Sequence, residues 1–481
     1  MKLEIMKPRR NRSSIGTSSS FGFDKEYDWG LYPQAERLLH IEVERFISKN
    51  SFARSFSKKM WDKTSTRFFD WIDHIVVPES RIRETALIRL GFSELNVETQ
   101  KGTRAFKHSG TIFFPVVLTE GREMEVVIKT ENIDHCVIKL NKKAKILGKK
   151  YSPYSKAILS KQGNYILSAA ERRGYSGFMV PDNVKDVDKY NRALKIFAKR
   201  ERKFVSDEKG MIYIEKLIKK VKKVMKKLSK SRTADAFFRN ERLYWESRNT
   251  AGRIQKKRQN ILGLGWGNHD HHTYRSSREN FARLISIFEI LGFLCRERFY
   301  AGPVAGWGAQ IMEHPDCDIV LFADVDITDK ERNKDFAHKD LKPTRKLGTV
   351  GLWVGLHGES ILQAGMHHLE ARFDFEKLRN DLPKYGANVM NPFSYFSFLK
   401  QAFTEGEKWK VEKKRLNLLL EKGLINKTHY QNFLRNGAIG SHMENLQRSQ
   451  GFKGFNQDSV TAIIKATDPR KYLHQTHKTA A

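Results

Sequence analysis

Two short phrases in the second half of this 481-residue chain carry side chains that could bind a metal ion and an acidic molecule. Residues 270–275 read Asp-His-His-Thr-Tyr-Arg, and residues 366–372 read Met-His-His-Leu-Glu-Ala-Arg. A neutral imidazole is a common metal ligand, and a guanidinium binds a carboxylate through two parallel hydrogen bonds. The repetition of a histidine doublet followed by an arginine therefore predicts a duplicated site.

Strand periodicity indicates which histidine of the second doublet can face such a site. Successive side chains of a strand point to opposite faces. His368, Glu370 and Arg372 then share a wholly polar face, whereas His367 shares a mostly apolar face with Leu369. We therefore predict His368 as a metal ligand, with Arg372 beside it.

The same spacing, a histidine four residues before an arginine, selects His271 and Arg275 in the first doublet. His271, Thr273 and Arg275 share one face of the expected strand, and His272 and Tyr274 share the other. Each copy of the phrase thus offers one imidazole and one guanidinium side by side.

The segments that follow the two phrases have the same order of expected elements. After the first phrase, Ser277 is expected to cap a helix that Gly292 ends, and strands are expected within residues 301–313 and 317–326. After the second, a helix is expected over residues 373–385, ended by Gly386. A strand, a helix and further strands form a βαβββ unit, and two such units can pair into an open, curved sheet.

With these residues the chain resembles the vicinal-oxygen-chelate superfamily, and within it most closely the 2-oxoadipate dioxygenase/decarboxylase family. In that family two strands each begin with a metal-binding histidine, the first is followed by a substrate-binding arginine, and a glutamate ligand comes late in the chain. The matching residues are His271 with Arg275, His368, and Glu444. The resemblance covers roughly residues 265–465 and passes over a long insert.

The resemblance implies a non-haem Fe(II) enzyme that oxidatively decarboxylates a small 2-oxo acid with O2. Two imidazoles and one carboxylate leave about three octahedral positions open, which suits a bidentate substrate and O2. Arg275, and from the opposite strand Arg372, would hold the far carboxylate of the substrate. The carboxylate ligand could instead come from another acid, and the candidates are Glu313, Asp324, Asp326 and Glu359.

Two other functions remain open. One is another metal-dependent enzyme of the same superfamily: an isomerase, a lyase or a ring-cleaving dioxygenase, since one fold serves many chemistries. The second is a basic protein without metal that binds nucleic acid or an anionic membrane through residues 195–230. Lysines surround an apolar stripe there and contribute to the net charge of +33. We favour a helix whose apolar stripe packs on the protein's own core and whose lysines face the solvent.

The composition indicates a folded protein that resides in a reducing compartment. Hydrophobic residues make up 40% of the chain and include 31 Phe, which excludes a disordered protein, while only three cysteines occur, without paired spacing. There is no apolar run long enough to span a membrane, and we expect a cytoplasmic location.

We predict an α+β protein whose C-terminal half contains paired βαβββ modules in a curved mixed sheet, with helical insertions. In the N-terminal half, Asp73-His74 resembles the start of a third, degenerate unit, for which we expect a mainly structural role. The expected regions are a disordered basic tail (1–22), an N-terminal α+β region (23–148), a helical Lys-rich connection (149–263), a first metal-site module (264–345), and a second module (346–481) with a helical insert (391–439).

Overall fold

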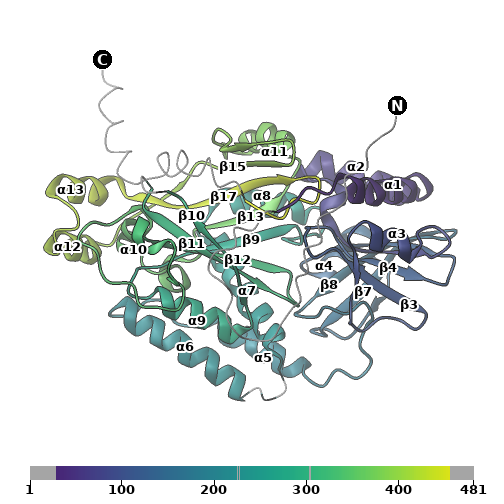
Figure 1. The fold of residues 1–481 in the computed structure, drawn as a ribbon, viewed down its shortest axis with the longest axis horizontal. Helices are drawn as coiled ribbons and strands as arrows, with labels where there is room; N and C mark the ends of the chain where they lie inside the picture. The colour runs from purple at the N-terminus through teal and green to yellow at the C-terminus, as the bar shows by residue number, and fades with distance from the viewer. Residues whose placement is uncertain (1–28, 225, 227, 303–304, 456–481) are drawn as a thin grey trace.

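Two mixed β-sheets lie side by side, and helices pack against both (Figure 1). The computed structural model describes residues 29–455 except residues 225, 227, 303 and 304. The predicted tail over residues 1–22 therefore lies outside the described residues. Both halves of the chain mix helices and strands, so the α+β class predicted from the sequence is confirmed.

The first C-terminal unit follows the predicted order. It comprises β9 (His269–Arg275), α9 (Phe281–Leu291), β10 (Leu294–Tyr300), β11 (Trp307–His314) and β12 (Ile319–Asp326). Gly292 ends α9 with a φ of 107°, a left-handed conformation that glycine adopts without strain. Asn280, not Ser277, precedes the helix, and Ser277 instead donates hydrogen bonds from its backbone N–H and its hydroxyl to Glu359.

The second unit is longer because a pair of helices interrupts it. It comprises β13 (His368–Arg372), α11 (Phe375–Asp381), β14 (Ser394–Tyr395), β15 (Leu399–Phe403), β16 (Glu407–Trp409) and β17 (Ala438–Arg448). The prediction of a helical insert over residues 391–439 is wrong for its first half, where β14 and β15 form a hairpin whose second strand pairs with β17. Only α12 (Lys413–Glu421) and α13 (Lys427–Asn436) are helical.

The N-terminal sheet contains two complete units rather than one degenerate unit. The first comprises β1 (Ile72–Pro78), α3 (Glu84–Arg89), β2 (Ser93–Glu94), β3 (Thr103–Lys107) and β4 (Val116–Thr119). The second comprises β5 (Met124–Lys129), α4 (Ile133–Leu140), β6 (Ile146–Leu147), β7 (Tyr154–Gln162) and β8 (Tyr165–Arg172). The helical prediction for residues 149–263 is therefore wrong over β7 and β8, which pair with each other and complete this sheet.

The two sheets share one strand order. It is β2-β3-β4-β1-β5-β8-β7-β6 in the first and β10-β11-β12-β9-β13-β17-β15-β14 in the second, with β16 added beside β17. In each sheet the first strands of the two units pair antiparallel at the centre, β1 with β5 and β9 with β13. The last strand of each unit pairs in parallel with its first. The chain therefore contains the same paired scaffold twice.

The remaining helices connect and cover the sheets. They are α1 (Pro33–Lys49), α2 (Ser51–Thr64), α5 (Val187–Ala198), α6 (Asp207–Val224), α7 (Lys230–Ser247), α8 (Thr250–Asn260) and α10 (Thr349–His357). The largest core gathers apolar residues of α5, α6, α7 and α9 under the C-terminal sheet, with Phe238 packed against Tyr274 and Phe288. No helix of the described ranges is both long and apolar enough to cross a membrane.

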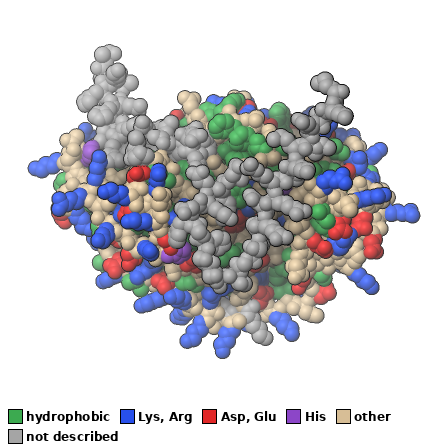
Figure 2. Space-filling model, viewed as in Figure 1, with side chains coloured by type: hydrophobic (Ala, Val, Ile, Leu, Met, Phe, Trp, Pro, Cys, Tyr) green, Lys and Arg blue, Asp and Glu red, His purple; other side chains and the backbone are tan. Residues whose placement is uncertain are grey.

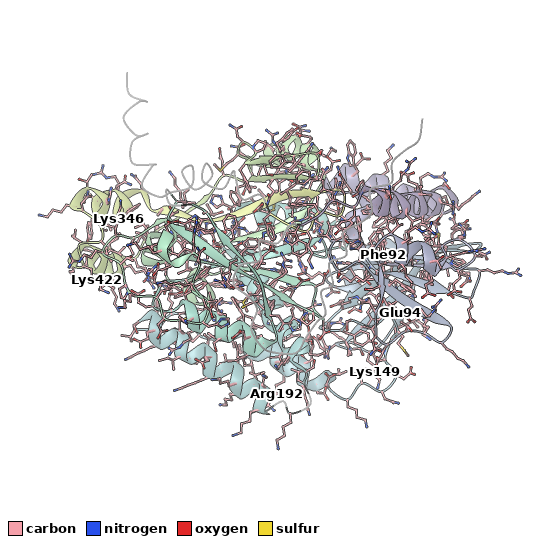
Figure 3. All side chains as sticks on the ribbon, viewed as in Figure 1. Phe92, Glu94, Lys149, Arg192, Lys346 and Lys422 are labelled. Carbon is pink, nitrogen blue, oxygen red and sulfur yellow. The ribbon has the colours of Figure 1, made fainter. Side chains whose placement is uncertain are left out.

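The basic helix predicted within residues 195–230 is α6, which runs along the edge of the molecule beside α9 (Figure 1). Ile214, Ile218 and Val221 are buried on its inner face, as expected for a helix that packs on its own core. Lysine and arginine side chains stand around the periphery of the view in Figure 2, and Arg192, Lys149 and Lys422 project outward in Figure 3.

The burial of Glu359 beside the turn before α9 predicts a pH-dependent stability. Burial, and then Asp207, raises the pKa of Glu359 to about 7, so the folded protein holds this proton more tightly than the unfolded chain. The contribution of Glu359 to the free energy of unfolding should therefore be full below pH 4.5 and fall by about 3 kcal/mol as the pH rises through 7. Urea unfolding at pH 5 and pH 8 should show a smaller difference for Glu359→Gln than for the parent; an equal difference would contradict the assignment.

Candidate metal centre

Four buried side chains from three neighbouring strands meet on one face of the C-terminal sheet. They are His271 of β9, His368 and Glu370 of β13, and Glu444 of β17. One nitrogen or carboxylate oxygen of each residue lies within 4.8 Å of the corresponding atoms of the other three. The structure thus brings together the three predicted ligands His271, His368 and Glu444, and adds Glu370.

Strand pairing explains why residues so far apart in the sequence converge. β13 lies between β9 and β17, and Glu370 stands directly beside Glu444 in the parallel register, while His368 stands opposite Thr273 in the antiparallel one. Because side chains alternate along each strand, residues at these positions point to the same face. His272 and His367, the other histidines of the two doublets, point to the opposite face and lie outside the cluster.

The distances within the cluster are those of groups arranged around a common point. His368 Nε2 lies 3.2 Å from Glu370 Oε1 and 3.6 Å from Glu444 Oε2, and His271 Nε2 contacts Glu370 Oε1. None of the four residues is more than 8% exposed. The donor atoms therefore face one another inside the protein.

Asp270 orients His271 from behind. A β-bulge places both residues opposite Glu370, and His271 Nδ1 lies 3.1 Å from Asp270 Oδ1, which directs Nε2 toward the cluster. Arg372 Nε donates a 2.7 Å hydrogen bond to Asp270, and Arg448 lies 3.5 Å from it. These two arginines and Asp270 line a cavity of about 270 Å³ between the two sheets.

His368 and Glu444 are also held by neighbours. The Nδ1 atoms of His368 and His367 lie 2.9 Å apart, which leaves His368 Nε2 facing the carboxylates and the Thr273 hydroxyl, 2.7 Å away. Gln401 of β15 donates a 2.8 Å hydrogen bond to Glu444 Oε1. His271, His368 and Glu444 therefore each have a partner that fixes their orientation.

Burial governs the protonation of the cluster. It lowers the pKa of His271 to about 4 and the pKa of His368 well below its usual range, so both imidazoles are neutral. It also raises the pKa of Glu444 to about 7, and burial together with Glu444 raises the pKa of Glu370 well above its usual range. Two carboxyls side by side in a low-dielectric site disfavour a doubly ionised state without a cation.

This donor set fits a divalent metal ion. Neutral imidazoles and carboxylates are the ligands of Fe(II), Mn(II) and Zn(II) sites, and a dication would balance both carboxylates. Glu370 Oε2 is buried and receives no hydrogen bond from a donor of the described residues. His271, His368, Glu444 and Glu370 are thus the residues that would hold such an ion.

Aromatic rings surround the cluster and limit the entry of water. Phe322 and Phe455 lie against the His271 ring, with ring centroids 4.6 and 5.4 Å away. Phe403 lies 5.1 Å from the His368 ring. In these surroundings electrostatic interactions are stronger than they are in water.

The two predicted substrate-binding arginines have different surroundings. Arg275 is buried, with its guanidinium 5.5 Å from the Trp353 ring centroid and its Nε 3.7 Å from Asp324 Oδ2. Arg372 forms an ion pair with Asp270, behind His271. Its partner is thus Asp270 and not Glu370, which lies two residues before it on the same strand. Which of the two meets a substrate stays a prediction.

The alternative acids named from the sequence lie outside the cluster. Glu313 pairs with Lys453 and Arg296. Asp326 accepts backbone hydrogen bonds at the start of α10. Asp324 stands beside Arg275, and Glu359 binds the turn before α9.

Sequence reasoning missed Glu370 as a ligand candidate and Asp270 and Gln401 as orienting residues. Glu370 shares the predicted strand face of His368, and this His-x-Glu alternation is a signal that indicates a further ligand. Asp270 directly precedes His271, but its role depends on the bulge, which the sequence pattern does not reveal. Gln401 lay in a segment expected to be helical.

The bulge and its aspartate recur at the equivalent place in the N-terminal sheet. Asp73 and His74 of β1 form a bulge against β5, just as Asp270 and His271 do against β13. His74 Nδ1 lies 2.6 Å from Asp73 Oδ2, and Arg172 donates hydrogen bonds of 2.7 and 2.8 Å to Asp73. The Asp-His-Arg arrangement behind His271 thus has a structural duplicate.

The remaining cluster positions differ between the two sheets. Aligned by strand register, Glu125, Val127 and Ser168 stand where His368, Glu370 and Glu444 stand. Lys156, at the place of Gln401, lies 2.7 Å from Glu125. An ammonium group therefore balances the single carboxylate of the N-terminal site, and the metal-type donor set occurs in the C-terminal sheet.

Comparison with known proteins gave low similarity. No protein-family model and no curated protein matches the chain. Among solved structures, a mutant of 4-hydroxymandelate synthase from Streptomyces coelicolor is 11% identical, with a TM-score of 0.27 over 84% of this chain and 98% of that one. Methylmalonyl-CoA epimerase from Mycobacterium tuberculosis is 10% identical, with a TM-score of 0.22 over 38% of this chain and 89% of that one.

The two Asp-His pairs provide a matched test of the metal centre. Asp270→Asn removes the charge that orients His271, and we expect a 10–100-fold loss of affinity for a divalent metal, the usual effect of losing such a partner. Asp73→Asn makes the same change at the duplicate and should leave the affinity unchanged. Metal titration followed by isothermal calorimetry measures both. An equal loss in the two variants would show a general effect on the fold instead.

Proposed function

We propose that this protein is a metal-dependent enzyme of the vicinal-oxygen-chelate superfamily, and that its metal is Fe(II). The observation that supports the proposal is the meeting of His271, His368 and Glu444 at the centre of a sheet built from paired βαβββ units. Two imidazoles and a carboxylate match the ligand set of non-haem iron oxygenases. The proposed reaction consumes O2 and oxidatively decarboxylates a small 2-oxo acid.

Bound Fe(II) would bind O2 and polarise the 2-oxo group of the substrate, and the oxidation of the 2-oxo acid with release of CO2 would supply the electrons that reduce O2. The side chains of this chain perform the other tasks. Asp270 and His367 keep the imidazoles in one orientation, and Phe322, Phe403 and Phe455 shelter the site from water.

Arg275 is the residue we propose for binding the far carboxylate of the substrate. It lies on the same strand face as His271, four residues later. A guanidinium in a sheltered site forms a planar, charge-assisted pair with a carboxylate. In the structure Asp324 lies beside it, and a substrate carboxylate would compete with Asp324 for the guanidinium.

Glu370 favours a second candidate function. With three protein ligands an octahedral ion keeps three positions, enough for a bidentate acid and O2. With Glu370 as a fourth ligand only two positions remain, which suffice for a bidentate substrate alone. An isomerase or lyase of the same superfamily would fit that arrangement.

Metal analysis tests the ligand assignment. We expect Fe(II) bound at the buried centre of anaerobically prepared protein, with occupancy lost in His271→Ala and in His368→Ala. The neighbours His272→Ala and His367→Ala serve as matched controls and should keep the metal, with a weaker affinity for His367→Ala because it contacts His368. Loss in the control pair alone would place the ligands on the opposite faces of the strands.

Oxygen consumption distinguishes the two candidate functions. With Fe(II) and a panel of 2-oxo diacids and aromatic 2-oxo acids, we expect oxygen uptake that accompanies CO2 release.

On the best substrate, Arg275→Lys should weaken substrate binding by about 1–3 kcal/mol, the scale of a charge-assisted hydrogen bond, without changing metal content. Glu370→Gln should retain oxygen uptake if three ligands suffice. Full metal occupancy without uptake of oxygen for any acid would exclude the dioxygenase and favour the isomerase or lyase.

A further inference from the structure

Three potential metal ligands that the proposed reaction does not use meet at the surface beside α9 and β10. They are Glu289 near the end of α9, Cys295 at the start of β10, and His338 in the segment between β12 and α10. We propose that these residues form a second metal site, for a thiophilic divalent cation of the Zn²⁺ type. This inference is independent of the reaction at the buried centre.

The distances between the three ligand atoms suit a tetrahedral ion. Glu289 Oε1 lies 3.0 Å from His338 Nε2, and Cys295 Sγ lies 4.0 Å from the same nitrogen. All three ligand atoms lie within 4.8 Å of one another. With Zn–S at about 2.3 Å and Zn–N at about 2.0 Å, the sulfur and nitrogen of a tetrahedral site are about 3.5 Å apart, so small side-chain movements suffice.

The surrounding chain positions each ligand in advance. Gly292 closes α9 and begins the short turn into β10, which places Glu289 and Cys295 next to each other. Asp335 accepts from His338 Nδ1 at 3.0 Å, so that Nε2 faces the other two ligands. A carboxylate on the far nitrogen is the usual arrangement behind a metal-binding histidine.

Buried contacts hold the segment that carries His338. Phe336 is 2% exposed and packs beside Phe281 of α9, with ring centroids 6.0 Å apart. Arg298 donates to the backbone carbonyl of Lys334. His338 is thereby held against the α9–β10 turn by contacts that do not involve the cluster.

The donor types separate this site from the buried centre. A thiolate, an imidazole and a carboxylate suit zinc, whereas the buried cluster contains only nitrogen and oxygen donors. His338 and Glu289 keep 46% and 41% of their side chains exposed, so water can complete the coordination. A bound metal ion would link residues 327–348 to α9 and the start of β10. This segment leads directly into α10, whose Trp353 lies beside Arg275.

Cobalt titration under reducing conditions tests the proposal, because thiolate coordination produces an intense charge-transfer absorption that a site of nitrogen and oxygen donors lacks. We expect Co²⁺ at saturation to give this band with the intensity of one thiolate-bound ion per chain, in addition to any Co²⁺ at the buried centre, and Zn²⁺ to remove it. Cys295→Ser should abolish the band while metal content at the buried centre is unchanged. Cys317→Ser, which alters another partly buried cysteine, should keep the band.

A second variant tests the site independently, in case Cys295→Ser does not fold. His338→Gln changes an exposed side chain and should weaken Co²⁺ binding at least tenfold, with the circular dichroism spectrum preserved. Zn²⁺ should also slow trypsin cleavage within residues 327–348 in the parent but not in this variant. Absence of the band at saturating Co²⁺, or its persistence in Cys295→Ser, would overturn the proposal.

Discussion

The arrangement of the C-terminal sheet depends on one electrostatic constraint, the burial of two carboxyls beside two neutral imidazoles. Burial, together with the repulsion between Glu370 and Glu444, makes the doubly ionised pair unfavourable, and burial removes the charge of His271 and His368. A divalent cation is the simplest group that resolves both effects, since it needs neutral imidazoles and ionised carboxylates. The paired units place these groups on the three central strands, where neither sheet edge nor solvent relieves the constraint.

The N-terminal sheet shows how the same scaffold exists without that constraint. It keeps the bulge and the Asp73–His74 pair, but Ser168 and Val127 replace two carboxyl positions, and Lys156 balances Glu125. The ammonium group is part of the chain, so the charges are matched by folding alone. The Asp-His bulge is therefore common to both sheets. The residues on the two neighbouring strands, β5 and β8 in one sheet and β13 and β17 in the other, decide whether a set of metal ligands results.

Much of the C-terminal fold could be predicted because it follows local periodicity. The alternation of faces selects His368, the matching spacing to an arginine selects His271, and Gly292 and Gly386 mark the helix ends. Strands β7 and β15 were misread as helical, because their polar residues, among them Lys156 and Gln401, lie on a sheet face whose character depends on pairing with distant strands. Glu444 was found through a family resemblance, since no local pattern connects it to His271.

Segments outside the central strands carry additional residues without changing the pairing of the sheet. Residues 327–348 follow β12 at the end of the first unit and lead into α10, which packs onto β9 and β12, whereas α12 and α13 lie inside the second unit, before β17. Asp326, at the end of β12, fixes the start of α10 through two backbone hydrogen bonds. The same helix places Trp353 against the guanidinium of Arg275, 5.5 Å from the ring centroid, so the end of β12 and the proposed substrate residue contact the same short element.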